Sequence, residues 1–466
     1  MAGRAPGRPT PGGRAAGGPM IKIVLAVLCV LGVAGAGVAL AGDPAGKVFP
    51  YPVRVETLDN GLQLILIPMP SEGLVAYWSI VRTGSRDEYE PGHTGFAHFF
   101  EHMMFRGTER HPADEYNRLI TRMGADANAY TTDDLTAYHL GIAKEDLETV
   151  MELEADRFQH LSYDESAFKT EAGAVYGEYR KSKMSPFFSI YEAVRETAFD
   201  RHTYGHTTMG FVEDIKAMPT MYDYSRRFFE RYYRPDNVVL LIAGDIEPDR
   251  VVELARRYYG DWKPGYVPPE IPPEPEQTRE RRIDVPYQGR SLPIIWIAYK
   301  NDRFRPDDRN WVASDLLASL AFGETSDLHK ELVLDKQWVE FIEAEVNVNR
   351  DPGLIDIISR VKDPEKVDAV LERIDSTIAR FQKELVSEKR LADLKSRLRY
   401  RFLMGLDTPD HVAASLARIV AVTGGIEAVE TYYTTLEQVT REDVRQAALR
   451  LTPQRRTVAV LRGKSE

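Results

Sequence analysis

Cysteine is almost absent from this chain of 466 residues, because Cys29 is its single example. That residue lies in an apolar N-terminal stretch, so the rest of the chain has no disulfide to stabilise it. The chain also lacks an excess of positive charge, since 60 Lys and Arg stand against 71 Asp and Glu, a formal net charge of −11. With no overall basic field to attract phosphate, this composition disfavours nucleic-acid binding.

Acidic residues are missing from the N-terminal segment, residues 1–41, whose only charges are positive. From Ile23 to Ala41 every residue is apolar or Gly, and Ala39-Leu40-Ala41 has the small-x-small pattern of a cleavage site. This layout predicts a signal peptide and a mature protein that begins near Gly42, secreted across the inner membrane into a bacterial periplasm. The alternative is an uncleaved anchor, because the apolar run is about long enough to span a bilayer.

The rest of the chain is long enough for two domains, since 43% of all residues are hydrophobic and 10% are aromatic. A run rich in proline and charge, Pro264–Pro286, is typical of an extended linker, because it can form neither a helix nor a central strand. We therefore expect one domain over residues 42–263 and a second over residues 287–466.

The order of predicted elements indicates that the second half repeats the first. The first half is expected to contain a strand pair around Asp59-Asn60-Gly61, a strand at Leu74–Arg82, helices at His93–Phe105, Lys144–Leu161 and Glu165–Lys183, and a strand at Asn237–Gly244. The second half is expected to contain a strand at Leu292–Tyr299, a helix at Asp307–Phe322, a strand pair around Asp351-Pro352-Gly353, long helices over Pro364–Leu403 and a strand at Thr457–Arg462. This repetition predicts an internal duplication.

The second copy lacks a motif that the first copy has. When Val312-Ala313 is laid onto Phe96-Ala97, the residues opposite the first copy's histidines are not metal ligands. The three aligned pairs are Ser314 with His98, Leu317 with Glu101, and Ala318 with His102. The second half is therefore expected to bind no metal in this way.

His98-Phe99-Phe100-Glu101-His102 places two imidazoles at positions i and i+4 of a predicted helix. They project about 40° apart, so both rings can bind one tetrahedral Zn²⁺. Glu101 lies on the same side, where its carboxylate can take a proton from a metal-activated water. This is the H-x-x-E-H order of the inverzincins. The alternative is a pair of surface histidines with a glutamate that forms a salt bridge.

Two histidines leave a catalytic zinc one protein ligand short. Glu171 and Glu178 lie on nearly the same face of the predicted helix, and Ala174 and Val175 between them make that face apolar. A carboxylate on a buried face costs several kcal/mol unless it is paired or binds a metal. Taken without the histidine motif, however, these two glutamates more commonly indicate an ordinary solvated face.

Several stretches resemble the pitrilysin/insulinase family of zinc metallopeptidases, whose smaller members include the mitochondrial processing peptidase subunits and bacterial paired-subunit peptidases. The resemblance extends over essentially the whole mature chain. It is carried by GHTGFAHFFEHMMFRGTERHP followed downstream by E-x6-E, by GADANAYTTDDLTAYH (Gly124–His139), by RYYRPDNVVLLIAGD (Arg231–Asp245) and by DLHKELVLDKQ (Asp327–Gln337). It implies an α+β fold of two homologous halves, each a mixed sheet covered by helices on one face, which together enclose a chamber.

The resemblance also implies roles for individual residues. His98, His102 and Glu178 would ligate zinc. Glu101 would be the general base, and Glu171 would orient a ligand and tune its basicity. The activity implied is hydrolysis of peptides or unfolded segments.

In this family the stretch that matches Asn128-Ala129-Tyr130-Thr131 is an edge strand, to which the substrate adds as a further strand. Asn128 would then contact the peptide backbone near the scissile bond, although Gly124-Ala125-Asp126 before it also fits a turn. The other histidines considered have no partner at ligand spacing and are interpreted as structural or surface residues. They are His93, His111, His139 and His160.

The chain departs from the family at one pattern, L-R-x6-Y, whose Arg and Tyr hold the substrate and stabilise the oxyanion. Val333 stands where the Arg is expected, and Glu340 where the Tyr is expected. This absence resembles the metal-bearing subunit of a two-subunit enzyme and predicts a homologous partner that supplies Arg and Tyr. A homodimer, or a contribution from Arg290 or Tyr299 of the same chain, is the alternative.

Two other functions fit parts of the sequence. The chain could be a non-catalytic core or binding subunit of a related assembly, although an intact motif argues against it. It could also be a zinc hydrolase that acts on substrates other than peptides.

Overall fold

The computed structural model describes residues 47–464, all of which belong to one compact unit, Asp43–Glu466. The predicted signal peptide, its cleavage site and the alternative anchor fall outside the described residues. Within residues 47–464 no single helix is long and apolar enough to cross a membrane. The pair Pro409–Thr423 and Glu427–Gln438 reaches that length and composition only together, and the two helices are bent by 91°.

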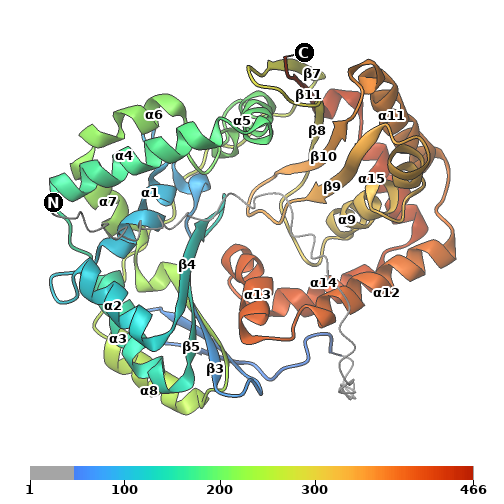
Figure 1. Ribbon diagram of the computed structural model, residues 1–466. Coiled ribbons are helices and arrows are strands. Elements are labelled where there is room, and N and C mark those ends of the chain that lie inside the picture. The colour runs from blue at the N-terminus through green and yellow to red at the C-terminus, as the bar shows by residue number, and fades with distance from the viewer. Residues whose placement is uncertain (1–46, 465–466) are drawn as a thin grey trace, which may run out of the picture. The chain divides into compact units, whose positions relative to one another are not determined.

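The first half is built on a six-stranded mixed sheet (Figure 1). In spatial order its strands are β1 (Arg54–Thr57), β2 (Gln63–Pro68), β6 (Val238–Gly244), β3 (Leu74–Val81), β5 (Thr136–Ala143) and β4 (Asp126–Thr131). Only β2 and β6 are parallel to each other. The predicted strand pair around Asn60-Gly61 is confirmed as β1 and β2, and Gly61 has the positive φ of 88° that this turn requires.

Helices of the first half cover one face of this sheet and bury a core rich in aromatic rings. The helices of this half are α1 (Phe96–Met103), α2 (Ala113–Met123), α3 (Leu147–His160), α4 (Glu165–Ser182), α5 (Pro186–Ala198), α6 (Val212–Ala217), α7 (Tyr222–Tyr232) and α8 (Pro248–Tyr259). The predicted helices around His98 and over Glu165–Lys183 are thus present as α1 and α4, one turn or less shorter at their ends.

The second half is built on a five-stranded sheet. In spatial order its strands are β7 (Arg281–Pro286), β11 (Arg456–Arg462), β8 (Ile294–Lys300), β10 (Leu354–Val361) and β9 (Val339–Val346). Its helices are α9 (Arg309–Phe322), α10 (Asp327–His329), α11 (Val367–Lys383), α12 (Glu388–Met404), α13 (Pro409–Thr423), α14 (Glu427–Gln438) and α15 (Arg441–Arg450). A second hydrophobic core lies between this sheet and helices such as α9, α11 and α15.

The two sheets have the same topology. The order β2-β6-β3-β5-β4 corresponds strand for strand to β7-β11-β8-β10-β9, and in each sheet only the first pair is parallel. Because α9 follows β8 as α1 follows β3, the duplication expected from the sequence is present in the structure. Ser314 and Leu317 on α9 are buried in the second half.

The predicted linker is only partly free of secondary structure. Residues 264–280 form no helix or strand, but the last six residues of the predicted segment form β7. Among the strands that the structure describes, β7 pairs only with β11, and an edge position tolerates Pro286, which has no N–H to donate. The second sheet therefore takes its first strand from the segment that was expected to be linker.

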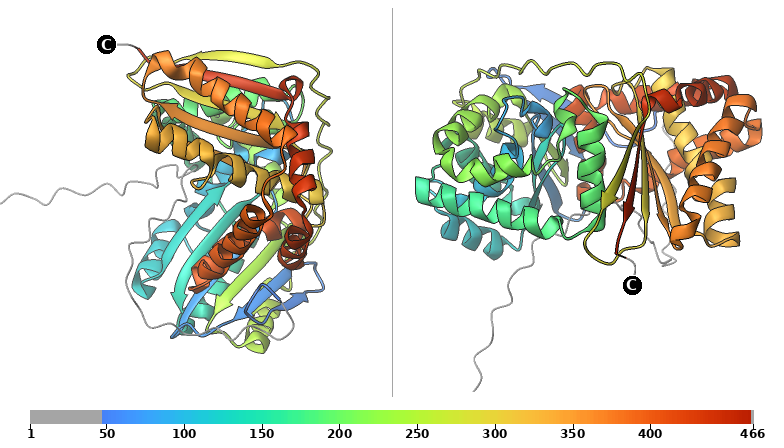
Figure 2. Two further views of the ribbon diagram at one scale, coloured as in Figure 1. Left: turned by 90° about the vertical axis from the view of Figure 1, so that its right-hand side faces the viewer. Right: turned by 90° about the horizontal axis from the view of Figure 1, so that it is seen from above.

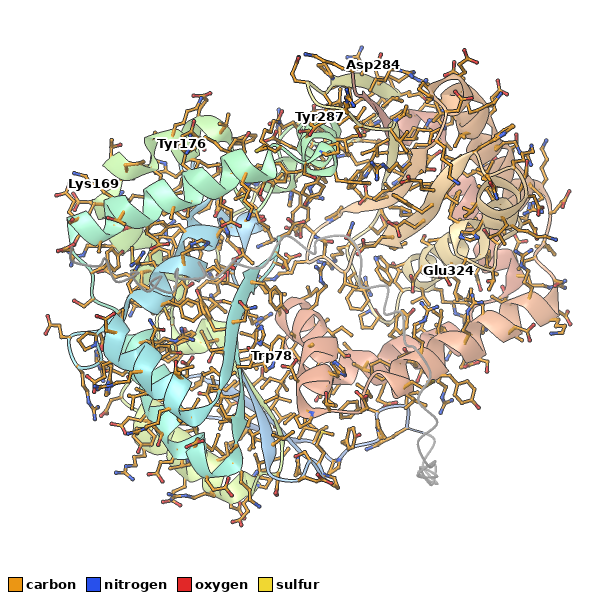
Figure 3. The ribbon with its side chains drawn as sticks, in the orientation of Figure 1. Trp78, Lys169, Tyr176, Asp284, Tyr287 and Glu324 are labelled. Atoms are coloured by element: carbon orange, nitrogen blue, oxygen red, sulfur yellow. The ribbon has the colours of Figure 1, made fainter. Side chains whose placement is uncertain are left out.

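One helix of each half packs against the sheet of the other half. Helix α13 packs on the face of the first sheet opposite that sheet's own helices (Figure 2). Val412, Leu416 and Val420 make this contact. Trp78 lies on the first sheet (Figure 3), and its Nε1 donates a hydrogen bond to Asp410 Oδ1 at 3.2 Å. In return, α5 packs on the second sheet through Ile190 and its neighbours (Figure 1). The predicted covering of one face is thus correct for each half's own helices, and the exchanged helix covers part of the opposite face.

Candidate metal centre

Helix α1 begins at a buried acidic cap. Glu88 accepts hydrogen bonds from the N–H groups of Gly95 at 2.8 Å and Ala97 at 2.7 Å, which are the free donors of a helix start. Gly95 has a φ of 90°, and a Cβ there would lie 2.6 Å from the carbonyl oxygen of Met209. Burial raises the pKa of Glu88 to about 8. Sequence reasoning missed Glu88, because a lone acid outside any periodic pattern carries no signal of its own.

Burial of one side of α1 turns its other side toward α4. Phe96, Phe99 and Phe100 are fully buried in the first core, so the helix cannot rotate about its axis without exposing them. The rings of His98 and His102 then lie side by side, with centroids 4.9 Å apart. The i, i+4 spacing predicted this juxtaposition.

Glu178 of α4 completes a cluster with these two rings. Its Oε2 lies 3.3 Å from Nε2 of His102 and 3.8 Å from Nε2 of His98. The donor atoms of the three residues all lie within 4.8 Å of one another, and within residues 47–464 this is the only such group of three His, Cys, Asp or Glu residues. The structure thus brings together His98, His102 and Glu178, the three residues to which the family resemblance gives the role of metal ligands.

The donor set fits a zinc ion. Nitrogen and oxygen ligands of tetrahedral zinc bind at about 2 Å, which places neighbouring donors about 3.3 Å apart. Two imidazoles and one carboxylate that converge at 3.3 and 3.8 Å need only small side-chain shifts to reach this geometry. Two histidines with one glutamate and an open fourth position are typical of a catalytic zinc site.

Glu171 lies on the far side of the His102 ring. Its Oε1 is 3.0 Å from Nδ1 of His102, and its Oε2 accepts a hydrogen bond from Nε of Arg106 at 2.6 Å. This contact holds the proton of the ring on Nδ1 and leaves Nε2 directed at Glu178. Glu171 therefore orients a ligand candidate and is not itself part of the cluster. Arg106 was not singled out from the sequence, because its partner lies on another helix.

Charge and burial shift the pKa values of the cluster in opposite directions. Burial lowers the pKa of His98. Burial alone would also lower that of His102, but hydrogen bonds to Glu171 and Glu178 raise the pKa of His102 to about 10. The hydrogen bond to His102 holds the pKa of Glu178 below its ordinary value. Without a metal ion, the two glutamates therefore favour the positively charged form of His102, in which both ring nitrogens carry a proton.

Glu101 points toward the edge strand β4. Its Oε2 accepts a hydrogen bond from the hydroxyl of Thr131 at 2.8 Å. Within the described residues β4 pairs only with β5, so its other edge is free. Asn128 and Tyr130 lie on this strand, and Ala129 between them is buried. The structure therefore places the predicted base beside the strand that was predicted to bind substrate.

The remaining histidines lie apart from the cluster. His93 packs on Tyr224 with ring centroids 4.1 Å apart, and His139 stacks on Trp78 at 4.4 Å. His160 is exposed at the end of α3, and His111 follows α1 in the loop before α2.

Val333 and Glu340 stand at the two positions where the resemblance predicts Arg and Tyr. Val333 packs against the second core, and Glu340 is exposed on β9 with Arg360 3.2 Å away. Tyr299 is buried in the second core, where its hydroxyl accepts a hydrogen bond from Arg456 at 3.2 Å. Arg290 is exposed in the loop between β7 and β8.

Comparison with known families decides the relationship. The family model described as Insulinase (Peptidase family M16) matches residues 65–211, and the model described as Peptidase M16 inactive domain matches residues 221–398. The chain belongs to the M16, or insulinase, family of peptidases. The first match contains α1 and α4 with the cluster, and the second covers much of the half that lacks the histidine motif.

Two M16 relatives match different shares of the chain. The zinc protease PqqE of Helicobacter pylori is 29% identical over 78% of this chain and 82% of its own length. Subunit beta of the mitochondrial-processing peptidase of Bos taurus is 30% identical over 45% of this chain and 42% of its own length.

Solved structures confirm the fold. The crystal structure of a protease from Helicobacter pylori matches with a TM-score of 0.83 at 26% identity and covers 88% of this chain and 99% of that chain. A putative M16-like peptidase from Alicyclobacillus acidocaldarius matches with a TM-score of 0.77 at 23% identity, over 89% and 99% of the two chains. The family and the two-half α+β fold predicted from the sequence are both confirmed.

Proposed function

We propose that this M16 protein is a zinc-dependent endopeptidase that hydrolyses peptides or unfolded segments. One observation carries the proposal: His98, His102 and Glu178 converge within 4.8 Å, next to a glutamate that faces a free strand edge. Membership of a peptidase family supports it, as does the name zinc protease of the Helicobacter pylori relative.

The residues of the cluster have separate tasks. A zinc ion held by His98, His102 and Glu178 would supply a Lewis acid that polarises the scissile carbonyl and acidifies the attacking water. Glu171 and Arg106 keep the His102 ring in the tautomer that offers Nε2.

Glu101 moves the proton. It accepts a proton from the attacking water as the oxygen bonds to the carbonyl carbon. It then donates that proton to the departing amine as the C–N bond breaks. The new carboxyl product gains the OH of the water and the amine product gains its H. A single carboxyl group serves both steps, because Glu101 returns in the second step the proton that it took in the first.

Strand addition explains the preference for unfolded substrates. Asn128, Ala129 and Tyr130 offer the free edge of β4, and only an extended segment can hydrogen-bond along such an edge. The pairing is largely between backbones, so it places a peptide bond beside Glu101 without requiring one particular sequence.

We propose that the active species pairs this chain with a homologous subunit that supplies Arg and Tyr. Val333 and Glu340 at the expected positions support this, as does the burial of Tyr299, which separates one candidate in cis from the cluster. The Bos taurus relative is named as a subunit. Contribution by Arg290 in cis and a homodimer are the alternatives.

Metal analysis and hydrolysis of quenched peptides test the activity. The purified mature chain should contain one zinc per chain, and chelation followed by zinc should remove and restore peptide cleavage. A parallel panel of small esters and amides distinguishes other hydrolases. Zinc without any hydrolysis, alone or with a homologous chain bearing the Arg and Tyr, would favour a non-catalytic core or binding subunit.

Oligomeric state tests the partner. Full peptidase activity from a purified monomer or homodimer refutes the heterodimer. Weak activity that rises when a homologous chain with Arg and Tyr is added supports it, with a variant of that chain lacking the Arg as the control.

We propose the periplasm as the location, on the basis of the leader in residues 1–41. Cell fractionation with N-terminal sequencing tests this. A periplasmic protein that begins near Gly42 is expected, whereas a membrane-bound protein with an intact leader would indicate the anchor.

A further inference from the structure

The half without the metal motif reaches into the half that has it. The tip of the hairpin between β9 and β10, Asn349–Asp351, contacts the turn between β4 and β5. Arg350 Nη2 donates hydrogen bonds to the carbonyl oxygens of Asp134, at 2.7 Å, and Arg82. The N–H of Arg350 also donates to Asp134 Oδ2 at 3.4 Å. One side chain thus fixes the backbone of two segments of the first half.

Asp351 holds the tip from its other side. Its Oδ2 accepts hydrogen bonds from Nε of Arg86 at 2.6 Å and from Nε2 of His202 at 3.0 Å. The hydroxyl of Tyr204 accepts from the N–H of Asp351 at 3.3 Å and donates to the Asp134 carboxylate at 3.0 Å. The tip and the turn are therefore joined by a network of charged hydrogen bonds, which are about twice as strong as neutral ones.

The turn itself is tightly enclosed. Asp134 is 2% exposed, and the N–H of Arg86 donates to the carbonyl oxygen of Asp133 at 2.8 Å. A Cβ on Gly84 would lie 2.2 Å from the carbonyl oxygen of Thr132, so no larger residue fits there. Arg195 of α5 pairs with Asp133 from the other side.

The residue directly before this turn contacts the proposed base. Thr131, the last residue of β4, donates its hydroxyl hydrogen to Oε2 of Glu101 at 2.8 Å. A carboxylate on a helix surface has several rotamers, and one hydrogen bond from a fixed donor selects among them. Because Thr131 precedes the enclosed turn directly, the position of its hydroxyl depends on that turn.

We infer that Thr131 is a positioning residue for Glu101 and that Arg350 and Asp351, from the half without the metal motif, keep it in place through the β4–β5 turn. This inference rests on the proposed peptidase function of Glu101. It gives the second half a task in the active site that needs no metal ligand and no contact with substrate. Arg350 is hydrogen-bonded to Asp134, the backbone of the turn connects Asp134 to Thr131, and Thr131 is hydrogen-bonded to Glu101.

Substitutions at Thr131 test the direct contact. Thr131→Val removes the hydroxyl but keeps the shape, and should lower kcat roughly 10-fold, the loss of one hydrogen bond to a charged group. Zinc affinity and KM should change little, and Thr131→Ser should restore kcat. Thr121→Val, at an exposed position of α2, is the matched control. Unchanged kcat in Thr131→Val, or an equal loss in Thr131→Ser, would overturn the inference.

Substitution of the hairpin tip tests the link between the halves. Arg350→Gln should lower kcat, raise amide hydrogen exchange in β4 and leave zinc affinity unchanged, whereas Arg303→Gln, on the exposed loop after β8, should do none of these. If Arg350→Gln does not fold, Asp351→Asn takes its place. The double variant with Thr131→Val should be no slower than Thr131→Val alone, because both act through one contact.

The outcomes separate this inference from the proposed function. Losses that multiply in the double variant, or unchanged β4 exchange in both tip variants, would overturn the link. A wild-type protein that binds zinc but cleaves no peptide, with or without a homologous subunit, would refute the proposed function whatever the exchange data show.

Discussion

Nε2 of His102 lies 3.3 Å from Oε2 of Glu178, although the two residues belong to different helices. Glu171, which precedes Glu178 on the same helix α4, instead contacts Nδ1 of the same ring at 3.0 Å. One imidazole therefore separates the two glutamates into a ligand candidate and a residue that orients the ring. The distinction depends on how α4 crosses α1, since both acids lie on nearly the same face of α4.

Glu178→Gln should lose most of its zinc, whereas Glu171→Gln should keep it with weaker binding. Loss of a residue that orients a ligand typically costs about 10–100-fold in metal affinity, and loss of a ligand costs more. Zinc content after dialysis against graded chelator concentrations measures both. Glu165→Gln, an exposed position on the same helix, is the control. Full zinc content in Glu178→Gln together with loss in Glu171→Gln would reverse the assignment.

Glu101→Gln should keep the fold and the zinc but lose most hydrolysis. The amide has the same shape and still accepts a hydrogen bond from Thr131, but it cannot accept the proton of the attacking water. A general base typically contributes about 10²–10⁴-fold in rate. Steady-state cleavage of a quenched peptide, with zinc content measured on the same sample, gives the result. Unchanged turnover would remove Glu101 from the mechanism.

Metal-free protein should lose stability as the pH rises from neutral to alkaline values. The folded-state pKa of His102 is raised to about 10 from an ordinary value of 6.5 by Glu171 and Glu178. A raised pKa contributes stability that is fully present below 6.5 and is lost as the pH rises through about 10. Urea unfolding of the chelated protein between pH 6 and pH 10 checks this. His102→Gln should show a smaller change over that interval, and an equal change would contradict the prediction.

Leu416→Ala in α13 should destabilise the first half, although the residue belongs to the second. Leu416 is fully buried against the first sheet, and such a truncation typically costs about 2–5 kcal/mol. Denaturant unfolding measures the loss, and amide exchange in β3 and β6 locates it. Ser415→Ala, on the exposed side of the same helix, should change little. Increased exchange confined to the second sheet would contradict the prediction.

Local patterns were enough to predict much of the fold and the juxtaposition of His98 and His102, whereas Glu178 was assigned only through the family resemblance. The Asn60-Gly61 turn, the apolar run before Gly244 and the spacing of His98 and His102 each specify a conformation within a few residues. The order of such segments also revealed the duplication, because both halves repeat the same sequence of periodicities.

Contacts between distant segments could not be predicted in this way. The exchange of α5 and α13 depends on packing between halves, and an apolar helix face such as that of α13 does not show which sheet it covers. Arg350 is one polar residue in a hairpin tip, and nothing nearby in the chain identifies Asp134 as its partner. β7 was missed because the proline-rich sequence before Arg281–Pro286 is typical of a linker. The segment forms a strand by pairing with the edge of β11, a contact between residues far apart in the chain.

The exchange of α5 and α13 also affects the order in which the molecule can assemble during synthesis. The ribosome completes β3 and β6 well before α13 emerges, so one apolar face of the first sheet stays uncovered until most of the chain has been made. Pairing across so long a stretch of chain is slow, and exposed apolar surface in the meantime favours aggregation. Until α13 is made, the apolar face of β3 and β6 therefore has no partner from the chain itself, so the first half reaches its final packing only after most of the second half has been synthesised.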